Sequence, residues 1–551
     1  MVVRERKSSV PGLYKKLKRL KDAYRENTTE FLRNSTIHGL CYFNKPELNT
    51  LERLFFMITF IVALIVSTHF ILKVTEKWAY SPTIASLNPK PEFITDEPFP
   101  SLSICNMNQA LKSKVANFSV YSEDYAILQT ICNRKVNITV IESIKDWATI
   151  KDYIQKVSQP CQRMLIDCNF GGLKYNCSHI FRAVVMSEGV CCIFNSLDPK
   201  FNFVDGNAGL SNEIQYPPDH KPVDWTLENG YQNPLPKYFT PMKAVGKGQS
   251  LGLRIVLNVE SDEYYCSSSN SVGFKIAMHN PNERPDIFEK GLLISPGYES
   301  FVRILPTKMD ADDKLRILKP KSRNCIFLNE YNLKTFVHYS YDNCMYECRT
   351  AMALHYCGCI AAYMAPRSPN SSVCHYENWK CLEDIKLAAK VNEFGCTQRC
   401  WHSCISKTYR MDVFAAPLEN GAMENMRTLI GNASIDYVKR NIAVARFYIE
   451  QLTYTSIKQS PYIGPLNVLS SFGGLISVFF GFSFISLAEI IYYICIRPCR
   501  TSATRSNLKH KNLNGEVKSR IQLANRSKIH YVNPYKGSMN MPLKRASIQQ
   551  Y

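Results

Sequence analysis

Two long apolar segments, separated by a long stretch of mixed polarity, dominate the pattern of hydrophobic and polar positions. Residues 54–72 and 475–496 are the two windows long and apolar enough to cross a bilayer roughly 30 Å thick, which takes about 20 helical residues. The first fifty residues are polar and basic, without the apolar core of a cleavable signal. We therefore expect two transmembrane helices, the first of which serves as its own insertion signal.

Charge is concentrated at the two ends of the chain. Residues 1–53 hold 12 Lys and Arg against 6 Asp and Glu, and residues 495–551 hold 12 against 1, so the ends carry +6 and +11 of the formal net charge of +20. Because basic segments stay on the cytoplasmic side of transmembrane helices, we expect both ends in the cytoplasm at the plasma membrane, and residues 73–464 outside. A basic tail beside a membrane attracts anionic lipid, so we expect residues 497–551 to meet lipid rather than nucleic acid.

The loop between the two apolar segments has the composition of a domain that folds in an oxidising compartment. Eighteen of the 21 cysteines lie from Cys105 to Cys404, an even number, whereas Cys41, Cys495 and Cys499 lie on or near the cytoplasmic side. The loop also holds five N-glycosylation motifs, and three further matches in the two end segments should stay unmodified. The five expected acceptors are Asn117, Asn137, Asn176, Asn370 and Asn432.

Cysteine spacing predicts helices in the second half of this loop. Cys344 and Cys348 are four residues apart, and Cys396, Cys400 and Cys404 follow one another at intervals of four, so each set is expected on one face of a helix. Two such helices, packed antiparallel, would be cross-linked rung by rung. A zinc site is the alternative use of these closely spaced cysteines, but an extracellular segment favours disulfides.

Other parts of the loop have the residue types of β-strands. Residues 253–265 (LRIVLNVESDEYY) are rich in β-branched and aromatic residues, and residues 445–457 (ARFYIEQLTYTSI) alternate in part. The fold class expected from the sequence is therefore a membrane protein with two transmembrane helices and a large, disulfide-rich α+β ectodomain.

The common catalytic motifs are missing from the sequence. It has no G-x-S-x-G elbow, no H-E-x-x-H, no G-x-x-x-x-G-K-[ST] and no G-x-G-x-x-G after a strand. The histidines and carboxylates show no spacing that a metal site or an acid–base pair requires. We expect neither an enzyme nor a bound metal or cofactor.

The second apolar segment has features that a simple membrane anchor does not need. It contains Glu489, and a charge in the middle of a membrane helix costs about 3 kcal/mol even on lenient scales. Two helices cannot enclose a pore alone, so a ring of identical subunits, each contributing its second helix, is the economical solution. Small residues would form a close-packing stripe on an unbroken helix, with Glu489 about a quarter turn away. Packing without a pore is the alternative use of this stripe, which comprises Ser470, Gly474, Ser477, Gly481 and Ala488.

Five segments follow one another in an order that resembles a known family. They are STIHG (35–39), FPSLSICN (99–106), GVCCIFN (189–195), YDNCMYECRTAMALHYCGC (341–359) and FGGLISVFFGFSFISLAEI (472–490). With the expected topology, they resemble the epithelial sodium channel, degenerin and acid-sensing channel family, and within it the insect pickpocket branch. The resemblance implies a homo- or heterotrimer of sibling subunits around a pore, which conducts cations with a preference for sodium and is blocked by amiloride.

The resemblance also assigns roles to residues near the second apolar segment. Gly481, Phe482 and Ser483 match the G-x-S selectivity filter, at which family members break the second helix into an extended stretch. Glu489 matches the acidic position below the filter, and Ser470 matches the degenerin position, where a bulky side chain holds such channels open. His38 and Gly39 match the gating motif, a cytoplasmic turn that re-enters beneath the filter. Phe482 departs from the small residue that many relatives carry between Gly and Ser.

A disulfide framework is implied in the same way. Cys132, Cys161, Cys192 and Cys266 stay unassigned, as two further pairs. Relatives usually have C-x-C where this chain has three residues between Cys396 and Cys400. The implied bonds are Cys105–Cys191, Cys168–Cys177, Cys325–Cys404, Cys344–Cys400, Cys348–Cys396, Cys357–Cys381 and Cys359–Cys374.

Two other functions are compatible with two membrane helices and a large outer loop. A trimeric ATP-gated channel shares the topology, but this loop has no lysine-rich nucleotide signature. A two-span scavenger or adhesion receptor would have no use for Glu489 or for a helix-breaking triplet. Insect members of the family serve mechanical, osmotic, salt or chemical sensing, so a sensory role is expected.

Proton gating through the family's acidic cleft is not expected here. Asp262 and Glu263 match the carboxylate pair of proton-gated relatives, but Arg367 and Arg446 stand at two of the partner positions. An arginine favours ionised carboxylates and stays charged itself, so acid would weaken the cleft rather than close it.

Overall fold

The computed structural model describes residues 25, 27–132, 147–204, 216, 219–365, 372–374, 378–391, 395–462, 464–497 and 500. The chain forms two compact units. The first, called here the helical unit, contains the described parts of Met1–Ala79 and Ile463–Tyr551, and the second, the ectodomain, is Tyr80–Tyr462. Each unit is described by itself.

The helical unit is built on α2 (Thr50–Tyr80) and on a broken helix made of α16 (Pro465–Phe480) and α17 (Phe484–Ile491). A π-helical turn, Tyr492–Ile496, continues α17. Within the described residues, α2 alone is long and apolar enough to cross a membrane. The pair Leu466–Phe480 and Phe484–Ile496, bent by 76°, adds a second crossing if its two halves count as one span.

Helix α2 is longer than the apolar window from which it was predicted. Its hydropathy falls where Lys73, Glu76 and Lys77 begin, but the helix continues to Tyr80 because these residues are good helix formers. Lys73 and Glu76 also form an i,i+3 ion pair at 2.8 Å. The prediction of residues 54–72 therefore located the apolar part of the helix and missed its polar ends.

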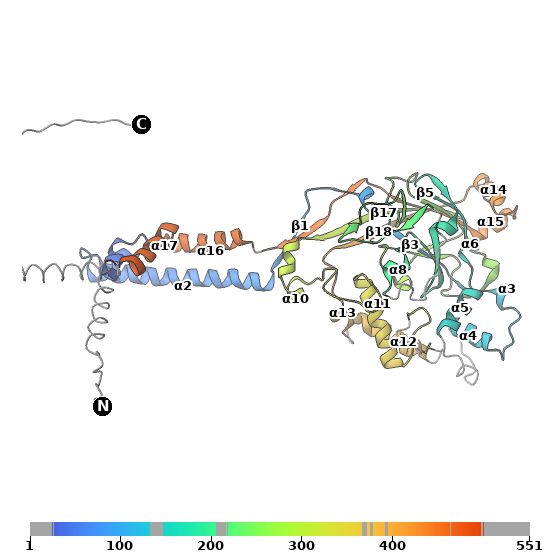
Figure 1. The fold of residues 1–551 in the computed structure, drawn as a ribbon, viewed down its shortest axis with the longest axis horizontal. Helices are drawn as coiled ribbons and strands as arrows, with labels where there is room; N and C mark the ends of the chain where they lie inside the picture. The colour runs from blue at the N-terminus through green and yellow to red at the C-terminus, as the bar shows by residue number, and fades with distance from the viewer. Residues whose placement is uncertain are drawn as a thin grey trace, which may run out of the picture. The chain divides into compact units, whose positions relative to one another are not determined.

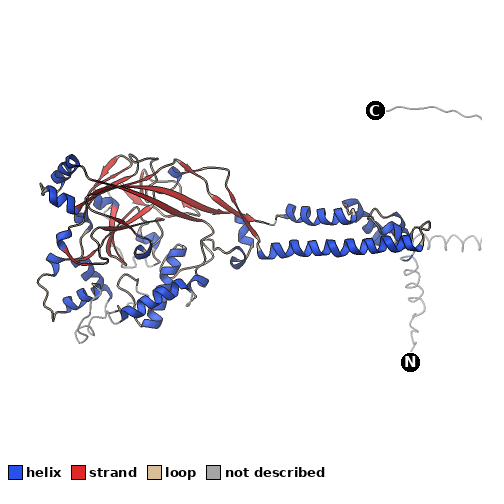
Figure 2. Cartoon of the chain, turned by 180° about the vertical axis from the view of Figure 1, so that it is seen from behind, coloured by secondary structure: helices blue, strands red, loops and turns tan. Residues whose placement is uncertain are grey.

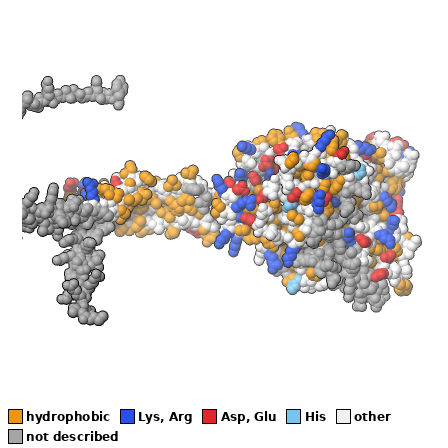
Figure 3. All heavy atoms as spheres, viewed as in Figure 1, with side chains coloured by type: hydrophobic (Ala, Val, Ile, Leu, Met, Phe, Trp, Pro, Cys, Tyr) orange, Lys and Arg blue, Asp and Glu red, His pale blue; other side chains and the backbone are white. Residues whose placement is uncertain are grey.

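Aromatic side chains join α2 to α16, which run side by side in Figure 1. Ring centroids lie 4.9 Å apart for Trp78 and Phe472, and 5.3 Å apart for Phe60 and Phe480. The remaining surface of these helices is strongly hydrophobic (Figure 3). Such a surface suits a lipid environment, since a water-soluble helix pair would bury it.

The ectodomain contains an eight-stranded and a five-stranded sheet. The two sheets enclose a core, and every residue of β3 is buried. In the larger sheet, β17 pairs along its length with β18 on one side and with β19 and β21 on the other. The larger sheet has the order β1 (Thr83–Leu87), β21 (Ile457–Pro461), β17 (Tyr298–Ala311), β19 (Ile442–Ile449), β13 (Leu253–Asn258), β5 (Leu165–Phe170) and β6 (Leu173–Tyr175), with β18 (Ser406–Pro417) beside β17.

The ectodomain also contains the smaller, five-stranded sheet and four separate two-stranded ribbons. The order of this sheet is β16 (Leu292–Ile294), β15 (Phe274–His279), β3 (Ser101–Asn106), β8 (Gly189–Phe194) and β7 (Phe181–Met186). The ribbons pair β10 (Trp225–Thr226) with β11 (Gly230–Tyr231), β12 (Tyr238–Thr240) with β9 (His220–Pro222), β14 (Tyr264–Ser267) with β4 (Asn108–Leu111), and β2 (Glu92–Phe93) with β20 (Thr453–Tyr454).

Both strand predictions are confirmed in their main parts. Residues 253–265 form β13 and the start of β14, but a 3-10 turn, Ser261–Glu263, separates them. Residues 445–457 form the end of β19, β20 and the start of β21. The turn places Asp262 and Glu263 outside any strand.

Helices gather beside the strands of the ectodomain. Figure 2 shows the group that contains α11, α12 and α13 apart from the sheets, as labelled in Figure 1. The described helices of the ectodomain are α3 (Lys112–Val115), α4 (Glu123–Ile131), α5 (Trp147–Val157), α6 (Cys161–Met164), α7 (Cys177–Ile180), α8 (Pro199–Asn202), α9 (Ile287–Lys290), α10 (Pro320–Arg323), α11 (Tyr341–Met352), α12 (Trp379–Val391), α13 (Cys396–Arg399), α14 (Asn420–Leu429) and α15 (Ile435–Asn441).

All eighteen ectodomain cysteines are paired. The structure contains the seven implied disulfides, including Cys348–Cys396 despite its unusual spacing. The four cysteines left unassigned form Cys132–Cys266 and Cys161–Cys192.

The prediction of a second cysteine-lined helix is wrong. Helix α13 ends at Arg399, and Cys400 has an extended backbone. The next residues pair with the segment around Ile326: the Ile326 N–H donates to the carbonyl of His402, and the Cys404 N–H donates to the carbonyl of Ile326. This strand-like bridge replaces the helical bonds that the four-residue spacing suggested, while Cys344–Cys400 and Cys348–Cys396 still form antiparallel rungs.

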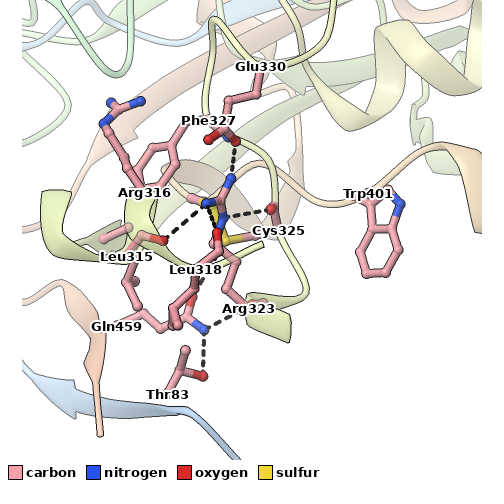
Figure 4. Close-up of a disulfide and its surroundings, with 12 residues drawn as sticks. Thr83, Leu315, Arg316, Leu318, Arg323, Cys325, Phe327, Glu330, Trp401 and Gln459 are labelled. Atoms are coloured by element: carbon pink, nitrogen blue, oxygen red, sulfur yellow. Dashed lines mark hydrogen bonds and ion pairs between the residues drawn. A yellow bond between two sulfur atoms is a disulfide. The ribbon is translucent and has the colours of Figure 1, made fainter. Parts of the chain in front are cut away.

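The buried side chain of Arg323 bonds to several segments of the chain beside the Cys325–Cys404 disulfide (Figure 4). The Arg323 guanidinium donates to the carbonyls of Leu315, Leu318 and Cys325 and pairs with Glu330. Full burial of this charge is tolerated because its donors are satisfied. The side chain of Gln459 on β21 donates to the carbonyl of Arg323 and to the hydroxyl of Thr83 on β1, which ties the β1–β21 ribbon to this turn.

Three of the five expected glycosylation acceptors lie on the described surface. Asn117, Asn176 and Asn432 are exposed. The other two, Asn137 and Asn370, lie outside the described residues.

Candidate ion pathway

The Gly481-Phe482-Ser483 triplet breaks the second apolar segment. Gly481 ends α16 with φ of 61°, a left-handed conformation that favours glycine, and its N–H donates to the Ser477 carbonyl at 2.7 Å. Ser483 then caps α17: its hydroxyl accepts from the Ser486 N–H, and the Ser486 hydroxyl accepts from the Ser483 N–H, both at 3.3 Å. The triplet is thus a helix stop followed by a helix start.

The turn that contains His38 and Gly39 lies against this break. The His38 N–H donates to the Phe480 carbonyl at 2.8 Å, a group left open by the end of α16. Gly39 has φ of 91° and precedes the 3-10 helix η1 (Leu40–Asn44). A side chain at Gly481 would collide with the His38 ring, so glycine is required there for close approach as well as for its backbone conformation.

Glu489 reaches the same N-terminal segment. Its carboxylate accepts from the backbone N–H of Thr36 at 3.1 Å and from the Thr36 hydroxyl at 3.0 Å. The Thr36 hydroxyl also lies 2.8 Å from the hydroxyl of Ser486. The Glu489 carboxylate therefore has defined hydrogen-bond partners, as a charge in an apolar segment requires.

The structure thus brings together the residues that the resemblance singled out around the break and adds Thr36 and Ser486. Sequence reasoning did not select these two. Their signals were a hydroxyl residue two positions before His38 and a serine one helical turn before Glu489. These hydroxyls, with Ser483, make the break rich in oxygen atoms.

Ser470 lies on the side of α16 opposite Phe472, which packs on Trp78 of α2. Ser470, Gly474 and Ser477 are exposed, and a Cβ on Gly474 would meet no other heavy atom within 4 Å beyond the helix's own backbone. This face has room for a neighbour. The continuous stripe expected for an unbroken helix stops at Gly481, where the chain turns before Ala488 and Glu489.

In the ectodomain, Asp262 and Glu263 have local partners. Asp262 pairs with Arg440 at 3.3 Å, and Glu263 accepts from the Ser113 N–H at 2.8 Å. That N–H, the Ser113 hydroxyl and nearby Arg163 lower the pKa of Glu263, more than burial raises it.

Of the two arginines expected near these acids, Arg367 and Arg446, the structure describes one. Arg446 pairs with Glu299 across β19 and β17, at 2.6 Å. Arg367 lies outside the described residues.

Comparison with known proteins decides the family. Residues 31–493 match the family described as amiloride-sensitive sodium channel. The chain belongs to this family. It is 33% identical over 497 residues to Pickpocket protein 28 of Drosophila melanogaster, a match that covers 89% of this chain and 82% of the relative.

More distant relatives within the family are also channels by name. Sodium channel protein Nach of Drosophila melanogaster is 23% identical over 518 residues, covering 88% of this chain and 91% of the relative. Acid-sensing ion channel 1 of Gallus gallus is 23% identical over 512 residues, covering 88% of this chain and 87% of the relative. The protein is therefore a membrane channel of the sodium channel family with a disulfide-rich ectodomain, and not an enzyme. Family membership sets aside the ATP-gated channel and the scavenger or adhesion receptor.

Proposed function

We propose that three copies of this chain, or of this chain and sibling subunits, form a gated, sodium-favouring pore in the plasma membrane. The observation that carries the proposal is the Gly481-Phe482-Ser483 break, where His38 bonds to the end of α16 and the nearby Thr36 bonds to the Glu489 carboxylate. A broken membrane helix is stable only where protein or a water-filled cavity receives its free backbone groups. A pore on a symmetry axis supplies that cavity.

The oxygen atoms at the break suit a hard cation. Backbone carbonyls and hydroxyls can replace the water around sodium, and a carboxylate one turn and a half below attracts cations to the path. Of the three filter residues, Ser483 alone has a side-chain oxygen, so Gly481 and Phe482 can offer an ion their backbone carbonyls only. The proposed filter is Gly481, Phe482 and Ser483, with backbone carbonyls and the Ser483 hydroxyl as ion ligands and Glu489 as the pore acid.

The gate is proposed to lie at α16. Ser470, Gly474 and Ser477 present a small-residue face, which permits three copies of α16 to approach closely around an axis. Closed and open states would then differ in how closely these faces meet, and Ser470 occupies the degenerin position.

Both ends of the chain lie in the cytoplasm, with the basic tail at anionic lipid. The role is sensory, with sodium as the conducted ion and no bound cofactor.

Expression of the chain in cells without endogenous amiloride-sensitive current tests the function, alone and together with sibling subunits. Mechanical, osmotic, salt and chemical stimuli are applied under whole-cell voltage clamp, and sodium is then replaced by a large organic cation. The proposal predicts an inward current that amiloride blocks and that sodium removal abolishes. The proposal would be contradicted if the protein reaches the cell surface but carries no such current under any stimulus or subunit combination, and if the Ser470→Phe variant carries none either.

A further inference from the structure

The cytoplasmic end of the second apolar segment contacts the chain that precedes the His38–Gly39 turn. Residues 27–34 are helical, and Glu30 on this helix forms an ion pair with Arg497. The neighbouring Phe31 packs on Tyr493, with ring centroids 5.5 Å apart. The Arg497 guanidinium also lies over the Tyr493 ring, 5.2 Å from its centroid. We call these four residues the cytoplasmic clamp.

The four side chains suit a joint between two helices. Tyr493 and Arg497 are four residues apart, so they share one face of the helical end, and Glu30 and Phe31 meet that face together. The arginine makes two favourable contacts at once, an ion pair and a cation–π contact. The contact therefore depends on charge as well as on apolar packing.

The clamp holds one side of the turn, and aromatic contacts with α2 hold the other. Beyond Gly39, the Tyr42 ring stacks on Phe56 at 4.0 Å and the Phe43 ring meets Phe60 edge-on at 5.5 Å. Between these two anchors lie the residues that touch the filter break and Glu489. A short segment fixed at both ends has few conformations left, so each anchor restricts where His38 can lie.

We propose that the cytoplasmic clamp is a positioning device for the turn: the Glu30–Arg497 pair and the Phe31–Tyr493 contact keep Thr36 and His38 against the filter break. None of the four touches the proposed filter, so they act through Thr36 and His38. This inference rests on the proposed function for its electrical effect, but the position of the turn can be measured without current.

Charge reversal and charge swap test the clamp in the full-length channel. Glu30→Arg and Arg497→Glu each place like charges together, and the double variant Glu30→Arg/Arg497→Glu restores an opposite pair. The pair is partly exposed, with 41% and 28% of the two side chains accessible, so each substitution is compatible with folding. The matched control reverses Lys45 and Glu47, an exposed pair 3.8 Å apart in the same cytoplasmic segment.

The first readout is the position of the turn. Ser35 is 9% exposed next to Thr36, and Ser35→Cys is a small change. With Cys41, Cys495 and Cys499 replaced by serine, this cysteine is the one cytoplasmic thiol, and its reaction with a thiol reagent is followed in inside-out patches or membrane vesicles. Each single reversal is expected to speed the reaction about threefold to tenfold, and the swap to return the rate to near that of the parent.

The second readout is electrical, in a background that carries Ser470→Phe. Each single reversal is expected to lower the standing current and the sodium-to-potassium preference at equal surface level, and the swap to restore more than half of both losses. The Lys45 and Glu47 reversals should change neither readout.

The outcomes separate the clamp from the proposed pore. Unchanged thiol reactivity in both single variants, or a swap that stays as reactive as the single variants, overturns the clamp. A background that carries no current counts against the placement of Ser470 and the pore, while the thiol rates still decide the clamp. Faster thiol reaction with unchanged current and sodium preference would overturn its role in positioning the filter.

Discussion

The backbone N–H of His38 donates to the carbonyl oxygen of Phe480, which joins a residue before α2 to the last residue of α16. The bond satisfies a carbonyl that the helix end leaves open. It also brings the His38 ring against Gly481, where a side chain has no room. The Gly481-Phe482-Ser483 break is therefore held by a segment distant in the sequence, so changes in either partner should affect the other.

Gly481→Ala is expected to abolish most of the current. Alanine at φ of 61° costs about 1–2 kcal/mol, and its methyl group must also displace the His38 ring. Gly473→Ala is the matched control, because a Cβ there meets no other heavy atom within 4 Å beyond the helix's own backbone. Current at equal surface expression checks the prediction, and an unaffected Gly481→Ala channel would show that the turn does not sit at the break.

Ser483 substitutions should change ion preference as well as current size. Ser483 caps α17 through its hydroxyl, so Ser483→Thr keeps the cap and adds bulk, whereas Ser483→Ala removes the hydroxyl. If this oxygen lies on the ion path, reversal potentials under exchanged sodium and potassium will differ among the three channels. Identical reversal potentials in channels with normal surface expression would place the filter elsewhere.

Thr36 and Glu489 should be energetically coupled. Thr36→Val removes the hydroxyl that donates to the carboxylate and keeps the side-chain shape, and Glu489→Gln removes the charge. Because both changes weaken the same charge-assisted contact, the double variant should be impaired much less than the sum of the single effects. The standing current of the Ser470→Phe background, at matched surface level, provides the measurement. Strictly additive effects would mean that the two residues act separately.

Extracellular acid should not open the channel through Asp262 and Glu263. The pKa of Glu263 lies below its ordinary value of 4.5, chiefly because of the Ser113 N–H. Its ionised form therefore contributes stability that is present above pH 4.5 and is lost only as the pH falls through the lower, folded-state value. A step from pH 7.4 to 5 leaves this carboxylate charged. A large, rapid inward current in that step, lost on Asp262→Asn and Glu263→Gln, would contradict the prediction.

Much of the fold could be predicted because the local sequence patterns favour the same helices and strands that the tertiary structure contains. The two apolar segments are long enough to stand out without tertiary information, and β-branched residues marked β13 and β19. The even count of loop cysteines matched a fully bonded ectodomain. The pairing itself came from resemblance, since spacing alone leaves many connectivities open.

The failures arise where tertiary contacts override local pattern. The spacing of Cys396, Cys400 and Cys404 suits a helix, but the helix ends at Arg399, and the backbone of residues 402–404 bonds to Ile326 instead. At the candidate site, the sequence showed an acid and a helix-breaking triplet without showing what meets them. Nothing in the sequence around Thr36 marks this threonine as functional. Its role follows from the contact with Glu489, which is visible only in the folded chain.

The standing sodium current of Ser470→Phe tests the central claim most directly, that α16 lines a gated pore. Phenylalanine on the exposed small-residue face cannot be housed where copies of α16 meet closely, so it should favour the open state. A tenfold rise in the open-to-closed ratio needs about 1.4 kcal/mol of differential cost. Ser470→Ala, which adds no bulk, is the control. The account predicts a large, amiloride-sensitive sodium current without any stimulus in Ser470→Phe and none in Ser470→Ala, and a Ser470→Phe channel as quiet as its parent at equal surface level would contradict it.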